Sequence, residues 1–244
     1  MHSRPVSRLG GLAVFFGFLI ATTREISVSL ALGGMVIISI GIIDDIYRID
    51  AYRKLIFQGI AAALAVAFGA RAAIGNATLS ALLAFLWLVA LPNAFNLIDG
   101  LDGLCARVAI FSSLALFVLG GSTYAVALSG AIVGFLPFNL RPAKMFLGDT
   151  GALFIGFSLG VISLDTLSKV PTPRGVLSVI LIFALPLADT AHAFLRRAVK
   201  GKNPFSPDRE HFHHKLVDRG FSHKEASLLL SIISLALCSI ATAI

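Results

Sequence analysis

The 244-residue chain is 57% hydrophobic and only 14% charged, with a mean hydropathy of +0.90 and a formal net charge of +7. Soluble domains are about 25% charged, so this composition excludes an ordinary water-soluble protein. The apolar runs are continuous rather than alternating, which excludes an outer-membrane barrel. Because backbone in lipid must satisfy its own hydrogen bonds, the sequence predicts an all-α, polytopic transmembrane helical bundle.

Nine apolar segments follow one another along the chain, and several are shorter than the ~20 residues of a typical span. They cover residues 9–22, 28–43, 55–70, 79–95, 108–120, 124–138, 151–167, 176–194 and 226–244. The first, after "MHSRPVSR", also resembles the apolar part of a signal peptide, although no clear cleavage site follows. We expect about nine spans in a single integral-membrane domain over residues 1–244.

The lysines and arginines predict the orientation of these spans. With a cytoplasmic N-terminus, 16 of the 20 basic residues fall in the inside connections and 4 in the outside connections. Such an excess marks the cytoplasmic side of a membrane protein. The positive charge is then explained by topology, so no nucleic-acid partner has to be invoked.

Acidic residues gather on the same predicted cytoplasmic face. Asp44 and Asp45 end the second apolar segment, Asp99 and Asp102 follow the fourth, and Asp149 opens the seventh in "LGDTG". Ionisable groups at such positions are functional by default. Two adjacent carboxylates repel each other, and Mg²⁺, which proteins hold through one or two carboxylates, would relieve that repulsion. The alternatives are a pair that only ends a helix and an ordinary turn aspartate.

The stretch "NAFNLIDGLDGL" carries polar residues directly after an apolar segment. Asn96, Asp99 and Asp102 are three residues apart and share one side if the helix continues. Gly100 and Gly103 predict a broken backbone instead. Irregular backbone at this depth survives where it lines a polar cavity, so we expect a cavity here.

The eighth connection, "NPFSPDREHFHHKLVDRG", predicts a short cytoplasmic helix over residues 207–219. Ser206 followed by Pro207 suits a helix start, and Gly220 suits the position after its end. Ser222 and Glu225 then form the capping-box pattern that opens the last apolar segment.

Basic side chains cluster on that predicted helix. Arg209 and His213 share one side, and His211 and His214 share another. Phosphate binding is the preferred interpretation, because Arg209 and Lys215 add donors that a metal ion would disfavour. A three-histidine zinc site and a basic helix on anionic lipid are the alternatives.

Acids for a metal, donors for phosphate and a lipid-facing scaffold together indicate phosphoryl transfer at a membrane face. In such reactions the protein mainly positions groups, while the metal neutralises charge on the phosphoryl group.

Six motifs, in order, resemble those of the polyprenyl-phosphate N-acetylhexosamine-1-phosphate transferases, the glycosyltransferase family 4 type. This family includes undecaprenyl-phosphate N-acetylglucosamine-1-phosphate transferases and phospho-muramoyl-pentapeptide transferase. The motifs, from residue 4 to about 223, are "RPVSRLGGLAV", "GIIDD…RKLIFQ", "NAFNLIDGLDGL", "FLGDTGALFIG", "PLADT" and "NPFSPDREHFHHKL".

The resemblance implies an enzyme that transfers a sugar-1-phosphate from a UDP-N-acetylhexosamine to polyprenyl (undecaprenyl) phosphate, releases UMP and starts a cell-envelope glycan. It implies Mg²⁺ as the cofactor, with Mn²⁺ as an alternative. It also implies the bacterial inner membrane, with the N-terminus and the catalytic loops cytoplasmic. The resemblance also implies the lipid bilayer as a partner and is compatible with a homodimer. The form "PDREHFHH" favours N-acetylglucosamine as the sugar.

The resemblance also implies a role for each candidate residue. These are the metal ligands Asp149 and Asn96, the catalytic pair Asp44 and Asp45, the phosphate-binding Lys54, the nucleotide contacts Asp99 and Asp102, and the diphosphate and sugar contacts Arg209, His211, His213 and His214. Two features depart from the family pattern. From the family pattern we expect a first span before the Arg-Pro motif, which this sequence does not include, and the sequence ends within an apolar segment, as expected of either a compact or a truncated member.

Two other classes compete with this interpretation. "DGLCAR" matches the start of the CDP-alcohol phosphatidyltransferase pattern, but the later aspartates of that pattern are missing. A transporter would place ionisable groups near mid-bilayer and often shows internal repeats. Only Asp189 and His192 lie near the interior of an apolar segment, and we expect them to be structural, satisfying each other or the end of the eighth segment.

Overall fold

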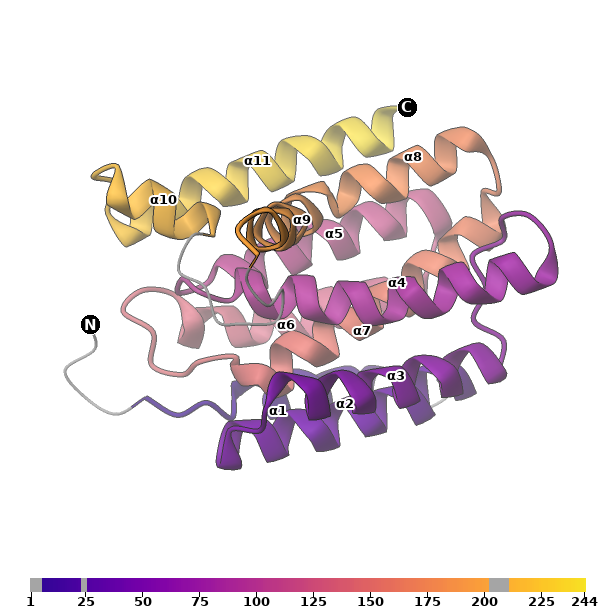
Figure 1. The fold of residues 1–244 in the computed structure, drawn as a ribbon, viewed down its shortest axis with the longest axis horizontal. Coiled ribbons are helices and arrows are strands. Elements are labelled where there is room, and N and C mark those ends of the chain that lie inside the picture. Colours follow the sequence, from indigo (N-terminus) through magenta and orange to yellow (C-terminus); the bar gives the residue numbers. More distant parts are fainter. Residues whose placement is uncertain (1–5, 23–25, 202–210) are drawn as a thin grey trace.

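The computed structural model describes residues 6–22, 26–201 and 211–244. Helices make up about four fifths of these residues, and the single β-bridge among them joins Ser7 and Met145. The helices are α1 (Gly10–Thr22), α2 (Val28–Tyr47), α3 (Ala51–Ala67), α4 (Ala77–Ile98), α5 (Leu104–Gly120), α6 (Thr123–Asn139), α7 (Gly148–Lys169), α8 (Pro173–Ile182), α9 (Ala184–Val199), α10 (Phe212–Asp218) and α11 (His223–Ala243). The long helices run side by side (Figure 1), which confirms the predicted all-α bundle.

Four helices, α2, α4, α7 and α11, are long and apolar enough to cross a membrane. The pair α8 and α9 also qualifies if it is counted as one bent span, and α1, α5 and α6 are shorter apolar helices. Large apolar side chains such as Ile232 and Ile240 on α11 are exposed on the outer surface, as lipid-facing side chains would be. The structure therefore supports a polytopic membrane protein, and the nine separate spans stay a prediction.

The eighth apolar segment is not the continuous span that the sequence predicts. It is divided at Phe183 into α8 and α9, whose axes differ by 72°. The cause is Pro186, which has no N–H to donate to the carbonyl of Ile182 and whose ring crowds that carbonyl. Ser112 Oγ donates to the freed Ile182 oxygen at 3.5 Å, so the bend leaves this oxygen satisfied.

Helix α7 forms the centre of the bundle. It is buried along nearly its whole length and packs against α1, α2, α4 and α5. Small residues allow this, because backbones in a membrane bundle approach closely where glycine replaces a larger side chain. A Cβ on Gly41 of α2 would lie 2.5 Å from Thr150 Cα, and one on Gly11 of α1 would lie 2.2 Å from Gly151 N. These contacts bring α1 and α2 against the first turn of α7.

The local predictions around the candidate site agree with the structure at several points. Helix α4 ends at Ile98, and Gly103 has a φ of 71°, so "NAFNLIDGLDGL" breaks as its glycines predict. Ser222 and Glu225 form the predicted capping box of α11, and Gly220 has a φ of 96° beyond the end of α10. Helix α10 begins at Phe212; residues 207–210 of the predicted helix lie outside the described residues.

Candidate active site

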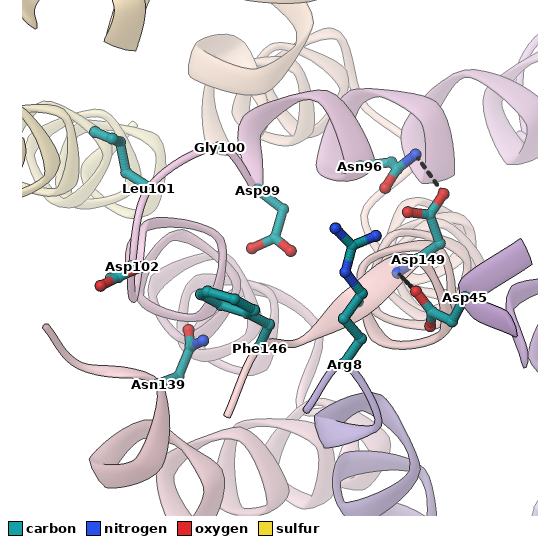
Figure 2. Close-up of a pocket in the computed structure, with 11 residues that line it drawn as sticks. Arg8, Asp45, Asn96, Asp99, Gly100, Leu101, Asp102, Asn139, Phe146 and Asp149 are labelled. Atoms are coloured by element: carbon teal, nitrogen blue, oxygen red, sulfur yellow. Dashed lines mark hydrogen bonds between the residues drawn. The ribbon is translucent and has the colours of Figure 1, made fainter. Parts of the chain in front are cut away.

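A polar cavity of about 330 Å³ lies at one end of the bundle (Figure 2). Its wall combines the end of α4, the α4–α5 turn, the start of α7 and the segment before α1. The lining residues are Arg8, Asp45, Asn96, Asp99, Gly100, Leu101, Asp102, Asn139, Phe146, Gly148 and Asp149. Five of the residues predicted for the site therefore meet at one cavity: Asp45, Asn96, Asp99, Asp102 and Asp149.

Two extended segments close one side of this cavity. Phe146 N–H donates to Ser7 O at 2.8 Å, and Gly10 N–H donates to Phe146 O at 3.1 Å. This pairing carries Arg8 to the cavity, and its guanidinium points between Asp99 and Asp149 (Figure 2). Arg8 and Phe146 were not predicted as site residues. Both lie within the motifs quoted above, Arg8 in "RPVSRLGGLAV" and Phe146 at the start of "FLGDTGALFIG", and these motifs are the signal that could have identified them.

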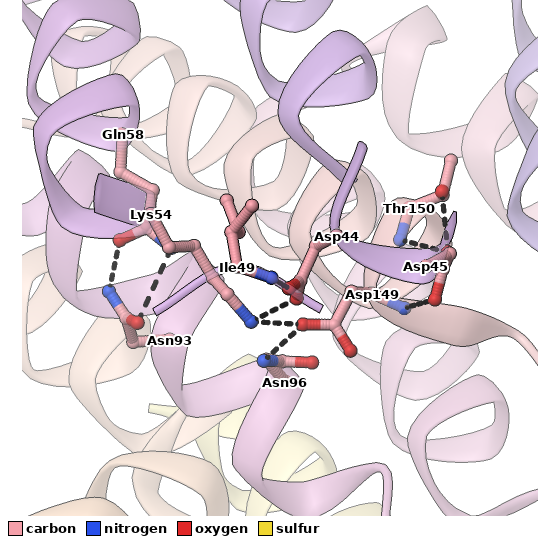
Figure 3. Close-up of polar contacts among 9 residues, drawn as sticks. All are labelled: Asp44, Asp45, Ile49, Lys54, Gln58, Asn93, Asn96, Asp149 and Thr150. Atoms are coloured by element: carbon pink, nitrogen blue, oxygen red, sulfur yellow. Dashed lines mark hydrogen bonds and ion pairs between the residues drawn. The ribbon is translucent and has the colours of Figure 1, made fainter. Parts of the chain in front are cut away.

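Lys54 joins acids from two helices at the edge of the cavity. Its ammonium forms ion pairs with Asp44 of α2 and Asp149 of α7 (Figure 3). Asn96 Nδ2 of α4 donates to the same Asp149 oxygen at 3.1 Å. Four predicted site residues thus meet through side-chain contacts from four different helices.

A buried amide pair aligns α3 with α4 beside this cluster. Gln58 and Asn93 exchange hydrogen bonds, with Asn93 Nδ2 donating to Gln58 Oε1 at 2.5 Å (Figure 3). Gln58 is fully buried, and a buried amide without a partner would destabilise the fold. The pair holds Lys54, one turn before Gln58, next to Asn96, which lies three residues after Asn93.

Asp44 also closes the turn between α2 and α3. Its Oδ1 accepts from Ile49 N–H at 2.8 Å, and Arg48 takes the left-handed conformation with a φ of 51°. The other oxygen, Oδ2, faces Lys54. Asp44 therefore both ends a helix and belongs to the charged cluster.

Asp45, the next residue, holds the start of α7. Its carboxylate accepts from the backbone N–H groups of Asp149 and Thr150, each at 3.0 Å, and from Thr150 Oγ1 at 2.6 Å. The first N–H groups of a helix have no partner within the helix, and a negative charge is favourable there. Asp45 thus fixes the position of Asp149.

The α4–α5 turn is tied to its surroundings on several sides. Asp102 Oδ2 accepts from Ala143 N–H at 3.2 Å, and Gly103 N–H donates to Asn139 Oδ1 at 3.1 Å. Asp99 faces the cavity (Figure 2). Burial raises the pKa of the Asp99 carboxyl well above its ordinary value, and the charges of Asp149, Asp45 and Asp102 raise that pKa further.

The histidines of α10 lie next to this turn but outside the cavity lining. A Cβ on Gly100 would lie 2.2 Å from His213 Nε2, so His213 packs directly on the turn. The rings of His211 and His213 are parallel, with centroids 5.8 Å apart, and His214 lies 4.2 Å from His213. Burial, followed by the nearby His214, lowers the pKa of His213 to about 4. Arg209 lies outside the described residues.

Asp189 and His192 do not satisfy each other, so the first of the two structural roles expected for this pair is wrong. Asp189 Oδ2 contacts His211 Nδ1 at 2.9 Å, and Asp189 Oδ1 accepts from Phe212 N–H at 2.8 Å. His192 Nε2 instead lies 2.5 Å from Lys215 Nζ. Both residues face α10, because residues three apart on a helix share a side. The docking of α10 against α9 cannot be read from a local pattern.

The charged cluster fits a hard cation better than zinc. Among the described residues, no group of three or more His, Cys, Asp or Glu side chains could hold a metal ion. Mg²⁺ requires fewer protein ligands, because substrate phosphates and water complete its coordination. Asp44 and Asp149 share the ammonium of Lys54, and Asn96 adds an amide. Oxygen donors from these residues suit Mg²⁺.

The sequence model of glycosyl transferase family 4 matches residues 27–167, which include the acids of the cluster. The chain belongs to this family. It is 35% identical to the probable undecaprenyl-phosphate N-acetylglucosaminyl 1-phosphate transferase of Bacillus subtilis, over 96% of this chain and 72% of that protein. It is 33% identical to the decaprenyl-phosphate N-acetylglucosaminephosphotransferase of Mycolicibacterium smegmatis, over 94% of this chain and 70% of that protein.

A third relative is the undecaprenyl-phosphate alpha-N-acetylglucosaminyl 1-phosphate transferase of Escherichia coli. The two sequences are 30% identical over 98% of this chain and 72% of that protein. As a member of glycosyl transferase family 4 with such relatives, the chain is a phosphoglycosyl transferase. Family membership decides against a transporter and a CDP-alcohol phosphatidyltransferase.

Proposed function

We propose that this family-4 transferase moves N-acetylglucosamine-1-phosphate from UDP-N-acetylglucosamine to polyprenyl phosphate, with undecaprenyl phosphate as the acceptor. In the net reaction, a lipid phosphate oxygen becomes bonded to the sugar-bearing phosphorus, and the bond from that phosphorus to UMP breaks. The polyprenyl diphosphate-sugar then starts a cell-envelope glycan. The names of the relatives support both the acceptor class and the transferred group.

The observation that carries the proposal is the meeting of Asp44, Lys54, Asn96 and Asp149 at the edge of the polar cavity. Catalysis of phosphoryl transfer is mainly positioning and charge stabilisation. A volume of about 330 Å³ lies within the range of small-molecule sites.

The residues of the charged cluster have different roles in this proposal. Asp149, Asp44 and Asn96 would hold Mg²⁺, which neutralises charge on the donor diphosphate when bound. Lys54 binds a phosphate, and Asp44 engages the lipid phosphate. Asp45 orients Asp149 through the start of α7.

The other side of the cavity suits the nucleotide. Asp99 and Asp102 accept hydrogen bonds from the uridine, whose N–H and ribose hydroxyl groups are donors. Gly100 leaves room for His213 of α10, which packs on this turn, and Arg8 adds a cation at the cavity that would face the phosphates. The histidines of α10 support this side from outside the cavity.

The charge distribution supports a cytoplasmic site in a bacterial inner membrane. Of the 20 basic residues, 16 fall on the side of the bundle that carries the cavity, if the nine predicted segments each cross the membrane. The UDP-sugar then reaches the cavity from the cytoplasm, and the lipid phosphate reaches it from the bilayer.

The test is a transfer assay on membranes that contain the chain. We expect incubation with radiolabelled UDP-N-acetylglucosamine, undecaprenyl phosphate and Mg²⁺ to yield a labelled lipid on organic extraction, together with UMP. Membranes with Asp149→Asn are the matched control. Absence of labelled lipid from the parent, with each substrate shown to be intact, would overturn the proposal. UDP-N-acetylgalactosamine in a parallel reaction tests the sugar.

A further inference from the structure

Helix α9 carries one acidic residue, Asp189, in the middle of its buried side. Asp189 is 2% exposed, and it shares that side of the helix with Leu185, Ala193 and Arg197. A buried carboxylate is costly unless hydrogen bonds satisfy it, so its partners determine what it does. The bend at Phe183 sets the direction of α9 and thereby the place of Asp189.

Both oxygens of Asp189 are used by the start of α10. Oδ1 accepts from the backbone N–H of Phe212, the first residue of that helix, at 2.8 Å. This N–H is one that no residue within α10 can satisfy. Asp189 therefore caps α10 from another helix.

The second contact of Asp189 sets the state of His211. Oδ2 lies 2.9 Å from His211 Nδ1, and an ionised carboxylate only accepts hydrogen bonds. The proton of a neutral His211 is thus held on Nδ1, and its Nε2 keeps a lone pair. An oriented histidine with a carboxylate partner of this kind is a common arrangement where the ring takes part in a site.

A further contact between α9 and α10 reinforces this arrangement. His192 Nε2 lies 2.5 Å from Lys215 Nζ, and the His192 ring stacks on Phe212 with centroids 5.7 Å apart. The position of α10 therefore depends on one side of α9.

The position of α10 reaches the cavity through His213. Its ring is 2% exposed, and its Nε2 has no hydrogen-bond partner among the described residues. The space beside Gly100 is filled by this ring, since a Cβ there would meet Nε2 at 2.2 Å. Gly100 itself lines the cavity. A displacement of α10 would therefore change the packing of His213 against the α4–α5 turn.

We propose that Asp189 is a positioning residue of the transferase. It holds the first turn of α10 and the tautomer of His211, so that His213 supports the Gly100 turn on the nucleotide side of the cavity. The inference rests on the proposed function for its kinetic consequences, and its structural part can be tested separately.

Asp189→Asn and Asp189→Ala separate the two contacts. The asparagine is the same size; its carbonyl can still accept from Phe212 N–H, but its NH₂ would donate to His211 Nδ1 and reverse the tautomer. The alanine removes both contacts. Asp165→Asn is the matched control, because Asp165 is half exposed and pairs with Lys169 within α7, away from the cavity lining.

The kinetic readout is kcat and the apparent KM for each substrate in detergent-purified protein. We expect Asp189→Ala, which frees the start of α10, to lower kcat/KM for UDP-N-acetylglucosamine about tenfold, the effect of losing the net contribution of one hydrogen bond. Asp189→Asn, which keeps the bond to Phe212 N–H, should lie between Asp189→Ala and the parent, and the apparent KM for undecaprenyl phosphate should stay close to the parental value in both variants and in Asp165→Asn. An active parent with unchanged donor kcat/KM in a folded Asp189→Ala would overturn the inference.

Hydrogen–deuterium exchange of the peptide covering residues 211–219 provides the second readout, which needs no activity. We expect faster exchange in Asp189→Ala than in Asp165→Asn, and near-parental exchange in Asp189→Asn. Equal exchange in Asp189→Ala and the parent would refute the capping of α10. An inactive parent would instead count against the proposed function, while the exchange measurement still tests the cap.

Discussion

Lys54 provides a direct test of the charged cluster, because it is the shared cation between Asp44 and Asp149. Lys54→Met keeps most of the length of the unbranched side chain and removes its charge. The side chains of Lys54, Asp44 and Asp149 are 16%, 8% and 26% exposed, so water screens the loss only in part. Breaking a fully buried pair costs about 3–5 kcal/mol, and for this partly exposed site we expect about 2–3 kcal/mol.

That loss translates into a measurable shift in thermal unfolding. At roughly 2–4 °C per kcal/mol for a chain of this size, the apparent midpoint in EDTA should fall by about 4–12 °C. Mg²⁺ should raise the midpoint of Lys54→Met by more than that of the parent, because the two carboxylates are then free of the competing ammonium. The assay is a thermal melt of detergent-purified protein with and without Mg²⁺.

Lys169→Met is the matched control for this experiment. Lys169 pairs with Asp165 at 2.9 Å, but their side chains are 46% and 43% exposed. Exposed pairs contribute about 0–1 kcal/mol, so this variant should melt close to the parent. Equal midpoints for the two lysine variants, or an equal Mg²⁺ effect on Lys54→Met and the parent, would refute the shared-cation account.

Three further predictions concern the acids of the cavity. Asp149→Asn should reduce transfer more than tenfold while the protein remains folded, and EDTA should stop the parent until Mg²⁺ or Mn²⁺ is restored; activity within tenfold at saturating Mg²⁺ would remove Asp149 from the site. Asp102→Ala should raise the apparent KM for the UDP-sugar far more than that for polyprenyl phosphate, because a site that hydrogen-bonds its ligand discriminates steeply; a rise in the lipid value alone would refute it. Asp99→Asn should raise the thermal midpoint in EDTA at neutral pH. The pKa of Asp99 is raised in the folded protein. The parent therefore loses stability as the pH rises above about 3.9, the pKa of an aspartate in the unfolded chain. Asparagine does not titrate, so in melts from pH 4 to 8 the midpoint of the variant should fall less with pH than that of the parent.

The sequence by itself determined the all-helical class and the break at the end of α4. Continuous apolar runs in lipid allow only helices. Gly100 and Gly103 interrupt the helix in the stretch that carries the polar residues after α4. The capping box of Ser222 and Glu225 was equally readable, because both residues act within one turn. Features that depend on neighbours in the chain were therefore predictable.

The division of roles between Asp44 and Asp45 was decided by the tertiary structure. In sequence they form one acidic pair, but successive residues on a helix point in directions about 100° apart, so they face different partners. One faces Lys54 of α3, and the other holds the start of α7. Which partner each acid meets depends on the close approach of α2 and α7 at Gly41.

The same reason explains Arg8, Asp189 and the bend at Phe183. Arg8 reaches the cavity through pairing between segments about 140 residues apart in the sequence, and Asp189 reaches His211 through the docking of two helices. Pro186 is visible in the sequence, but a bend at proline is stable only where another group satisfies the freed carbonyl. Here Ser112 Oγ of α5 donates to the carbonyl oxygen of Ile182. Local sequence determines which backbone is allowed and which groups need partners, and the packing of helices distant in sequence decides which partners those groups find.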